Sequence, residues 1–343
     1  MSLWKKSAVE LAKGLRDGDY SAVEVMADTL ARIERVNPAL NALVETYPDK
    51  ALAQARDADA QRAKGEDPRP LEGIPISIKV NVDVAGLANT NGLPALKDNI
   101  ASNDAPVVAN LKNAGAILVG RSNTPELSMR GTTDNPLYGL THSPWDNRAS
   151  PGGSSGGAGA ACAAGMGPIH HGNDIAGSLR FPASACGCAT LKPGLGRVPA
   201  FNPSATAERG LLAQLMSVQG AICREVKDVR LATQIMAQAD PRDPWWAPVA
   251  DKPNPARGPV ALISSMPGVD VDPAIAKALQ DASRWLEEAG YRIEEAAPPR
   301  LTDAADLFWP MLLAEERAAS SATGSLSTSA IGVLGDEAVQ RAR

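Results

Sequence analysis

A run of small residues from Gly152 to Gly165 opens with two serines, Ser154 and Ser155, which could carry nucleophilic chemistry. The segment GGSSG fits the pattern G-x-S-x-G, in which a serine on a tight turn works with a later acidic residue and then a histidine. The preceding residues, WDNRASP, are polar and broken by proline rather than strand-like, and all three histidines lie at or before position 171. A Ser-His-Asp triad in that order cannot be built, so a serine nucleophile here needs another base.

Lysine can act as such a base where burial keeps it neutral, and Lys79 is the candidate. The segment GIPISIKV predicts a strand with one apolar face, because Ile74, Ile76, Ile78 and Val80 alternate with other residues. Lys79 faces away from the isoleucines. On the residues alone, two plainer interpretations stay open: a lysine on a solvated strand face, and a flexible glycine-serine loop.

Three blocks of the sequence together resemble the amidase signature family. They are GIPISIKVN around Lys79, SPGGSSGGAGAA around Ser154, and HGNDIAGSLRFPASACGCATLKP around Ser178. The blocks stand in the order of the family, and the separation of 24 positions between the two serines, 178 minus 154, matches its spacing. The resemblance extends from the helical N-terminal part to about Arg230, and more loosely to residues 260–295.

The resemblance implies a role for each of these side chains. Ser178 would be the nucleophile that accepts the acyl group, Ser154 would bridge it to the base, and Lys79 would be the base. A cis peptide after Gly153 would hold the bridging serine. The oxyanion hole would consist of four main-chain amides, those of Ile175, Ala176, Gly177 and Ser178.

Neighbouring residues are expected to support this site. The resemblance makes Asp174 and Arg180 a buried charge pair that brackets the nucleophile turn. Gly153, Ser155 and the small residues after them allow the following helix to approach its neighbours closely and so fix the turn.

Some positions depart from the family pattern or need no catalytic role. Val80 follows the base where Asp is usual, and Ala176 stands where the family has glycine. Neither change removes a side chain that the proton relay uses, although the Ala176 methyl narrows the acyl pocket. A structural or packing role is expected for four nearby polar residues, Asn123, Glu126, His170 and His171.

Hydrophobic spacing, together with capping residues, glycines and prolines, predicts the helices and strands that position these residues. Ser21 and Glu24 form a capping box for a helix from Ala22 to Val36 that Asn37-Pro38 should stop. A helix capped by Asp104 should end at Gly115 and lead into the short strand AILVG. The segment PVALISS predicts a strand, Asp272-Pro273 opens a helix that Gly290 closes, and YRIEE predicts another strand.

Alternating strands and helices predict an α/β fold with a sheet covered on both faces. The resemblance specifies an amidase-signature-like fold with a mixed central β-sheet. We expect one domain over 1–343, with a helical N-terminal part over 1–70, a catalytic core over 71–230 and a peripheral part over 231–343. The chain resembles a family member that lacks the C-terminal portion.

Composition excludes several other classes of protein. The net charge is −5 and no block of lysine or arginine stands out, which argues against nucleic-acid and anionic-membrane partners. No apolar run is long enough to span a membrane, and the N-terminus does not read as a secretory signal, so we expect a cytoplasmic protein. The glycines are not followed by the lysine of a phosphate-binding loop. The four cysteines lack metal spacing, so reduced, buried thiols and no metal or other cofactor are expected.

The function implied by the resemblance is hydrolysis of a carboxylic amide through an acyl-enzyme. The expected partner is a small-molecule amide, and a homodimer is left open. Two alternatives remain: the A-type component of a glutamine-dependent amidotransferase, which would need partner chains, and a catalytically silent binding module on the same fold. Intact Lys79, Ser154 and Ser178 argue against the silent module.

Overall fold

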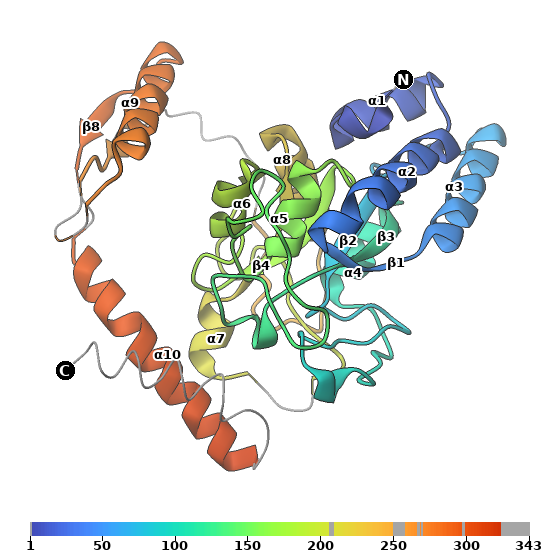
Figure 1. The fold of residues 1–343 in the computed structure, drawn as a ribbon. Coiled ribbons are helices and arrows are strands. Elements are labelled where there is room, and N and C mark those ends of the chain that lie inside the picture. Colours follow the sequence, from blue (N-terminus) through green and yellow to red (C-terminus); the bar gives the residue numbers. More distant parts are fainter. Residues whose placement is uncertain are drawn as a thin grey trace. The chain divides into compact units, whose positions relative to one another are not determined.

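The computed structural model describes residues 2–205, 209–249, 258–265, 268, 270–296 and 299–323. They fall into two compact units (Figure 1). Unit 1 comprises Met1–Arg209 with Ala213–Pro248, and unit 2 comprises Gly210–Leu212 with Val249–Arg343. The expectation of one domain over the whole chain stays a prediction.

A six-stranded mixed sheet forms the centre of unit 1, in the order β1-β3-β2-β4-β6-β5. β2 is parallel to both β3 and β4, while β1 is antiparallel to β3 and β6 is antiparallel to β4 and β5. The strands are β1 (Leu43–Thr46), β2 (Pro75–Lys79), β3 (Ile117–Ser122), β4 (Ile169–Asp174), β5 (Ala189–Thr190) and β6 (Val218–Cys223).

Burial along β2 shows that both faces of this sheet are covered. Alternate residues of a strand point to opposite faces, and all five residues from Pro75 to Lys79 are buried. The predicted strand is therefore correct, but the face opposite the isoleucines is not solvated: Lys79 itself has 0% exposure. The predicted α/β class with a mixed sheet is confirmed.

Helices surround the sheet in unit 1. They are α1 (Ala8–Asp17), α2 (Ala22–Leu40), α3 (Pro48–Ala63), α4 (Pro106–Asn113), α5 (Gly156–Ala163), α6 (Arg180–Cys186) and α8 (Val226–Met236), with 3₁₀ turns η1 (Leu3–Lys5), η2 (Pro94–Leu96) and η3 (Glu126–Ser128). A further helix, α7 (Leu211–Met216), begins in the part of the chain assigned to unit 2. No described helix is long and apolar enough to cross a membrane.

Carboxylates from distant elements cap two N-terminal helices. Asp228 on α8 accepts hydrogen bonds from the first amides of α1, those of Ala8 and Val9, at 2.9 and 3.0 Å. Asp59 on α3 binds the first amides of α2 in the same way. Free amides at a helix N-terminus favour negative charge, so each carboxylate caps the start of one helix and links it to the helix that carries the carboxylate.

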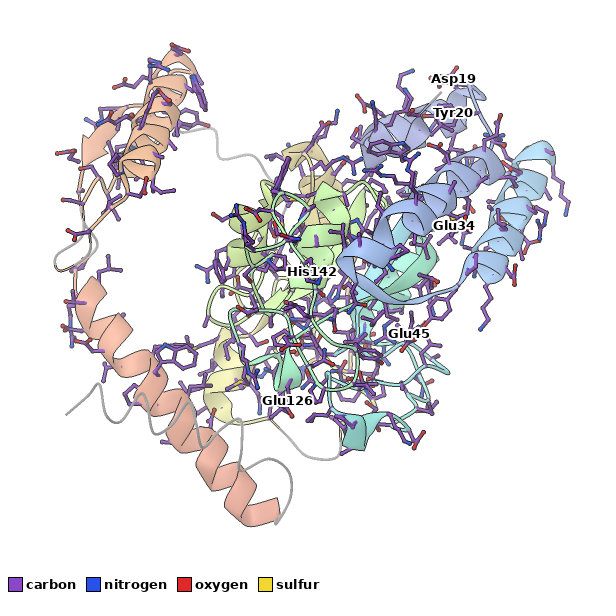
Figure 2. The ribbon with its side chains drawn as sticks, viewed as in Figure 1. Asp19, Tyr20, Glu34, Glu45, Glu126 and His142 are labelled. Atoms are coloured by element: carbon purple, nitrogen blue, oxygen red, sulfur yellow. The ribbon has the colours of Figure 1, made fainter. Side chains whose placement is uncertain are left out.

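Figure 2 shows Tyr20 beside α1, where its hydroxyl donates to the Glu10 carbonyl oxygen.

Two predicted helix boundaries are wrong. The capping box of Ser21 and Glu24 forms as expected, but α2 continues through Pro38 to Leu40. Proline removes only one N–H here, in the last turn, and the Asn37 side chain accepts from the two amides that follow the helix, those of Ala42 and Leu43. Asp104 does not cap α4, because its carboxylate instead accepts from the Ala85 amide and pairs with Lys112.

The described residues of unit 2 beyond Val249 include a parallel pair of strands and two helices. β7 (Val260–Leu262) pairs with β8 (Ile293–Glu295), and α9 (Pro273–Glu288) lies between them in sequence. The Asp272 carboxylate accepts from the Ala274 amide, as the Asp272-Pro273 pattern predicted, and Gly290 adopts a positive φ of 87° just after the helix. The last described helix is α10 (Leu301–Thr323).

Small residues in α5 are required by close backbone approach. Every residue from Gly156 to Cys162 is buried. A Cβ atom added at Gly157 would lie 2.6 Å from the Ala42 carbonyl oxygen and would also overlap the main chain of Asn123. The run of glycine and alanine is therefore a packing surface and not a flexible loop.

Replacement of Gly157 by alanine tests this packing. Alanine gains about 0.5–1 kcal/mol over glycine inside a helix, but the overlap with main-chain atoms should cost about 1–3 kcal/mol. We expect Gly157→Ala to lower the free energy of unfolding, measured by urea denaturation. Gly194→Ala is the control, because no atom lies within 4 Å of a Cβ added there. A Gly157→Ala variant as stable as the control would contradict the close-packing explanation.

Candidate active site

Lys79, the last residue of β2, contacts Ser154 directly. Its Nζ atom lies 2.7 Å from Ser154 Oγ and donates to Asn173 Oδ1 at 2.9 Å. Both Lys79 and Ser154 are buried, at 0% and 1% exposure. The structure thus brings together two of the three residues expected to form the relay.

The environment of Lys79 favours its neutral form. Burial lowers the pKa of Lys79 well below its ordinary value of 10.5, and the negative charge of Asp174 opposes this effect. No carboxylate among the described residues accepts a hydrogen bond from Nζ. An uncharged amine in contact with a hydroxyl can accept the hydroxyl proton, which is what a general base requires.

The turn that carries Ser154 is held from both sides by Thr133. The peptide between Gly153 and Ser154 is cis, as the resemblance implied. Thr133 Oγ1 donates to the Gly152 carbonyl oxygen at 2.9 Å and accepts from the Gly156 amide at 3.2 Å. One buried hydroxyl therefore fixes the residues before and after the serine pair.

Ser155 links this turn to the end of β4 and to the Ser178 turn. Its hydroxyl lies 3.4 Å from both the amide and the carbonyl oxygen of Asn173. Its main-chain amide donates to the Ser178 carbonyl oxygen at 3.2 Å. The Ser154 and Ser178 turns are therefore in contact, although no hydrogen bond joins Ser154 Oγ to Ser178 Oγ among the described residues.

Asp174 organises the turn around Ser178. Its carboxylate accepts from the amides of Gly177 and Leu179 at 2.7 and 3.1 Å, and from the Arg180 guanidinium at 3.0 Å. Burial raises the pKa of Asp174, but these hydrogen bonds outweigh that effect and lower it below the ordinary value. The expected buried charge pair is corrected in one respect: Asp174 is buried, but the Arg180 side chain is 54% exposed, because it reaches the carboxylate from the solvent side.

The same contact alters the expected set of oxyanion donors. The Gly177 amide is already engaged by Asp174 at 2.7 Å, so it does not point freely at a ligand. Among the described residues, no acceptor is in place for the amides of Ile175, Ala176 and Ser178. The oxyanion-hole role of the four amides stays a prediction.

Sequence reasoning missed several polar residues of the site. Asn173 accepts a hydrogen bond from Lys79, and Thr133 binds the residues on either side of the serine pair. Arg121, fully buried on β3, donates to the carbonyl oxygens of Lys79 and Val82 at 3.2 and 2.8 Å and holds the chain where β2 ends. The sequence offered one signal for Asn173, its position beside Asp174 in the GNDIAGS run. It offered no signal for Thr133 or Arg121.

The histidines and the other supporting residues take structural positions. His170 Nδ1 lies 2.8 Å from Ser77 Oγ, and His171 Nε2 lies 2.9 Å from Gln219 Oε1. Burial lowers the pKa of each histidine to about 3, so both are neutral near pH 7. Asn123 binds the loop around Thr141, and Glu126 pairs with Arg130 (Figure 2 labels Glu126).

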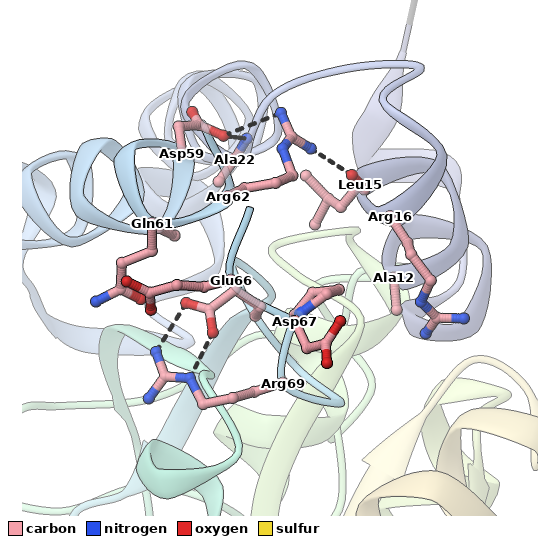
Figure 3. Close-up of a pocket in the computed structure, with 13 residues that line it drawn as sticks. Ala12, Leu15, Arg16, Ala22, Asp59, Gln61, Arg62, Glu66, Asp67 and Arg69 are labelled. Atoms are coloured by element: carbon pink, nitrogen blue, oxygen red, sulfur yellow. Dashed lines mark hydrogen bonds and ion pairs between the residues drawn. The ribbon is translucent and has the colours of Figure 1, made fainter. Parts of the chain in front are cut away.

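Other features of the described residues add no competing site. No three His, Cys, Asp or Glu side chains there gather as metal ligands. All four cysteines are free; three are buried as expected, and Cys188 is partly exposed. A pocket among α1, α2, α3 and the segment that follows α3 (Figure 3) is lined by paired charges, such as Arg62 with Asp59 and Arg69 with Glu72.

The buried amine should make stability depend on pH. The folded-state pKa of Lys79 is lowered, so the unfolded chain binds the proton more tightly, and stability attributable to this group falls as pH drops from 10.5 toward the folded-state value. The slope can reach about 1.4 kcal/mol per pH unit. We expect Lys79→Met to remove this slope and to be more stable than the parent near pH 7. If the free energy of unfolding changes equally with pH in the two proteins between pH 6 and 10, this explanation is contradicted.

Comparisons with known proteins identify relatives over most of the chain. The chain is 56% identical over 302 residues to an indoleacetamide hydrolase of Bradyrhizobium diazoefficiens, covering 87% of this chain and 57% of that protein. It is 38% identical over 294 residues to the A-type component of the glutamyl-tRNA(Gln) amidotransferase of a Picosynechococcus species, covering 82% and 59%. The chain thus spans less than two thirds of the length of these relatives.

A solved structure shares the fold. The structure of 6-aminohexanoate cyclic dimer hydrolase complexed with substrate superimposes with a TM-score of 0.81 at 28% identity, covering 99% of this chain and 73% of that one. The Amidase family matches residues 24–338. This protein therefore belongs to the amidase family, the amidase signature enzymes.

Proposed function

We propose that this protein hydrolyses the C–N bond of a carboxylic amide, with Ser178 as nucleophile, Ser154 as bridge and Lys79 as base. The observation that supports this most strongly is the contact of a fully buried lysine, free of any carboxylate hydrogen bond, with Ser154 at 2.7 Å. A structural lysine would be expected at the surface or paired with an acid. This one is paired with a hydroxyl beside a second serine turn.

The proposed reaction has two halves. In the first, the Ser178 proton passes through Ser154 to Lys79 while Ser178 Oγ bonds to the amide carbonyl carbon; the C–N bond then breaks and the proton returns to the departing nitrogen. In the second, water gives a proton to the same relay and adds to the acyl carbon; the bond from that carbon to Ser178 Oγ then breaks, the relay returns the proton to Ser178, and the carboxylic acid leaves. The contact between Ser154 Oγ and Ser178 Oγ forms in the substrate complex, since catalytic hydrogen bonds are often long without substrate.

The developing negative oxygen is stabilised by main-chain amides. We assign this role to Ile175, Ala176 and Ser178, whose amides have no acceptor among the described residues, and not to Gly177, whose amide binds Asp174. In comparable sites, one donor is worth about 3–4 kcal/mol in the transition state. The Asp174 carboxylate instead fixes the curvature of the turn.

The relatives indicate a first substrate to test. A relative with 56% identity is named an indoleacetamide hydrolase, so we propose a primary arylacetamide, such as indole-3-acetamide, which would yield the carboxylate and ammonia. The similarity to the A-type component of an amidotransferase keeps glutamine as the competing ammonia donor. Purified 343-residue chain that releases ammonia from the arylacetamide, but not from glutamine, supports the hydrolase; the reverse preference would favour the amidotransferase.

Covalent labelling tests the nucleophile. An activated serine reacts with a fluorophosphonate, so we expect one adduct on Ser178, mapped by mass spectrometry, and none in Ser178→Ala. Ser184→Ala, an exposed serine of α6, should label like the parent. An adduct on Ser154 would reassign the nucleophile.

Replacement of Lys79 tests the base. Loss of a positioned acid–base group lowers turnover by about 10² to 10⁴, so Lys79→Ala should lose that much kcat while circular dichroism shows a retained fold. Lys79→Arg should be as damaging, because guanidinium does not give up its proton. In the parent, kcat/KM should fall as pH drops through the lowered pKa of Lys79, where the amine becomes protonated. A folded Lys79→Ala variant with parental turnover at neutral pH would remove lysine from the mechanism.

A further inference from the structure

Lys79 Nζ has a second partner besides Ser154, and that partner is an amide. Asn173 Oδ1 accepts from Nζ at 2.9 Å. A neutral amine has two N–H donors and one lone pair. If Asn173 takes one N–H, the orientation of the lone pair is restricted, and it can face the Ser154 hydroxyl, whose oxygen lies 2.7 Å away.

The Asn173 amide is held in one orientation by Asn81. Asn173 Nδ2 donates to Asn81 Oδ1 at 3.0 Å, and Asn81 Nδ2 reaches back to Asn173 Oδ1 at 3.3 Å. A flipped Asn173 would point two N–H donors at the Lys79 amine and leave Asn81 Oδ1 without its donor. The oxygen of Asn173 must therefore face Lys79.

Asn81 is oriented in turn by η3. Its Nδ2 donates to Ser128 Oγ at 3.0 Å, and the Ser128 hydroxyl donates its own proton to Asn91 Oδ1 at 2.7 Å. The Ser128 hydroxyl also lies 2.9 Å from Thr124 Oγ1, so its oxygen has three polar partners. Ser128 has a positive φ of 59°, a conformation uncommon for residues other than glycine. Hydrogen bonds thus connect Ser128, Asn81, Asn173 and Lys79 in one chain.

The remaining charged and titratable groups around Lys79 come from two strands. Asp174 and His171 lie on β4, and Arg121 on β3 donates to the Lys79 carbonyl oxygen. None of these side chains makes a hydrogen bond to Nζ among the described residues. Of the two partners of Nζ, Ser154 has an O–H that can be transferred, whereas the Asn173 amide oxygen is an uncharged acceptor with no such proton.

We propose that Asn173, fixed by Asn81, is a positioning residue for the base: its oxygen orients the Lys79 amine toward Ser154 without supplying the negative charge that would keep that amine protonated. This inference rests on the proposed function of Lys79. A carboxylate at the same place would also accept the N–H, but at 2.9 Å it would strongly favour the ammonium form. The choice of amide over acid then sets the pH range in which the relay works.

The test exchanges the Asn173 amide for a carboxylate of the same shape. We expect Asn173→Asp to move the acid limb of the pH profile of kcat/KM upward by at least about one unit, so that kcat/KM below the limb falls at least about tenfold. Asn103→Asp, the same exchange at an exposed residue that shares no hydrogen bond with this network, should leave the profile unchanged. A folded Asn173→Asp variant with the parental limb would overturn the proposal.

A second variant guards against misfolding of the first. Asn81→Ala keeps Asn173 but removes the partner that orients it, so kcat should fall about tenfold while KM changes less than about twofold, as expected for an effect on the chemical step. Both kcat and KM at parental values would count against the orienting network.

A titration that needs no turnover separates this inference from the proposed function. In protein labelled with ¹³C at lysine Cε, the signal absent from Lys79→Met reports the protonation of Lys79. Asn173→Asp should raise its midpoint, and an unmoved midpoint would overturn the inference whatever the activity. If Asn173→Asp raises the Lys79 midpoint but the parent protein hydrolyses no amide, the inference holds and the proposed function is contradicted.

Discussion

An amine buried without a carboxylate partner is the constraint on which the rest of this structure depends. Removing an ammonium ion from water is costly, so Lys79 can lie at the end of a covered strand only if the neutral form is accepted there. Its polar partners are accordingly a hydroxyl and an amide. The sheet supplies the burial, and the turn before α5 and the end of β4 supply partners that satisfy the amine while leaving it basic.

Charge is present near this amine but is directed elsewhere. Asp174, the adjacent carboxylate, accepts hydrogen bonds from the amides of the Ser178 turn and from Arg180. The Arg180 side chain is 54% exposed and pairs with this buried carboxylate at 3.0 Å. One residue therefore shapes the nucleophile turn while its influence on the base stays small compared with that of burial.

Local patterns in the sequence were sufficient for the elements and for the order of the three blocks. The alternation around Ile76 predicted the strand, the Ser21 and Glu24 pair predicted one helix start, and Asp272-Pro273 predicted another. The end of α2 and the cap of α4 were mispredicted, because α2 tolerates Pro38 in its last turn and the Asp104 carboxylate binds the Ala85 amide instead. The roles of Thr133, Arg121 and Asn81 could not be predicted, since their partners lie tens of residues away; only Asn173 carried a local signal, its place beside Asp174.

The Asp228 carboxylate that caps α1 has a consequence for how the chain is made. Its partners Ala8 and Val9 precede it by 220 and 219 residues, so on the ribosome the first helix must wait for most of unit 1 before its exposed amides find their acceptor. At about 5–20 residues per second, that interval is on the order of 10 to 40 seconds. Throughout it, the N-terminal segment is available to chaperones and proteases, and its docking marks the completion of unit 1 rather than the beginning.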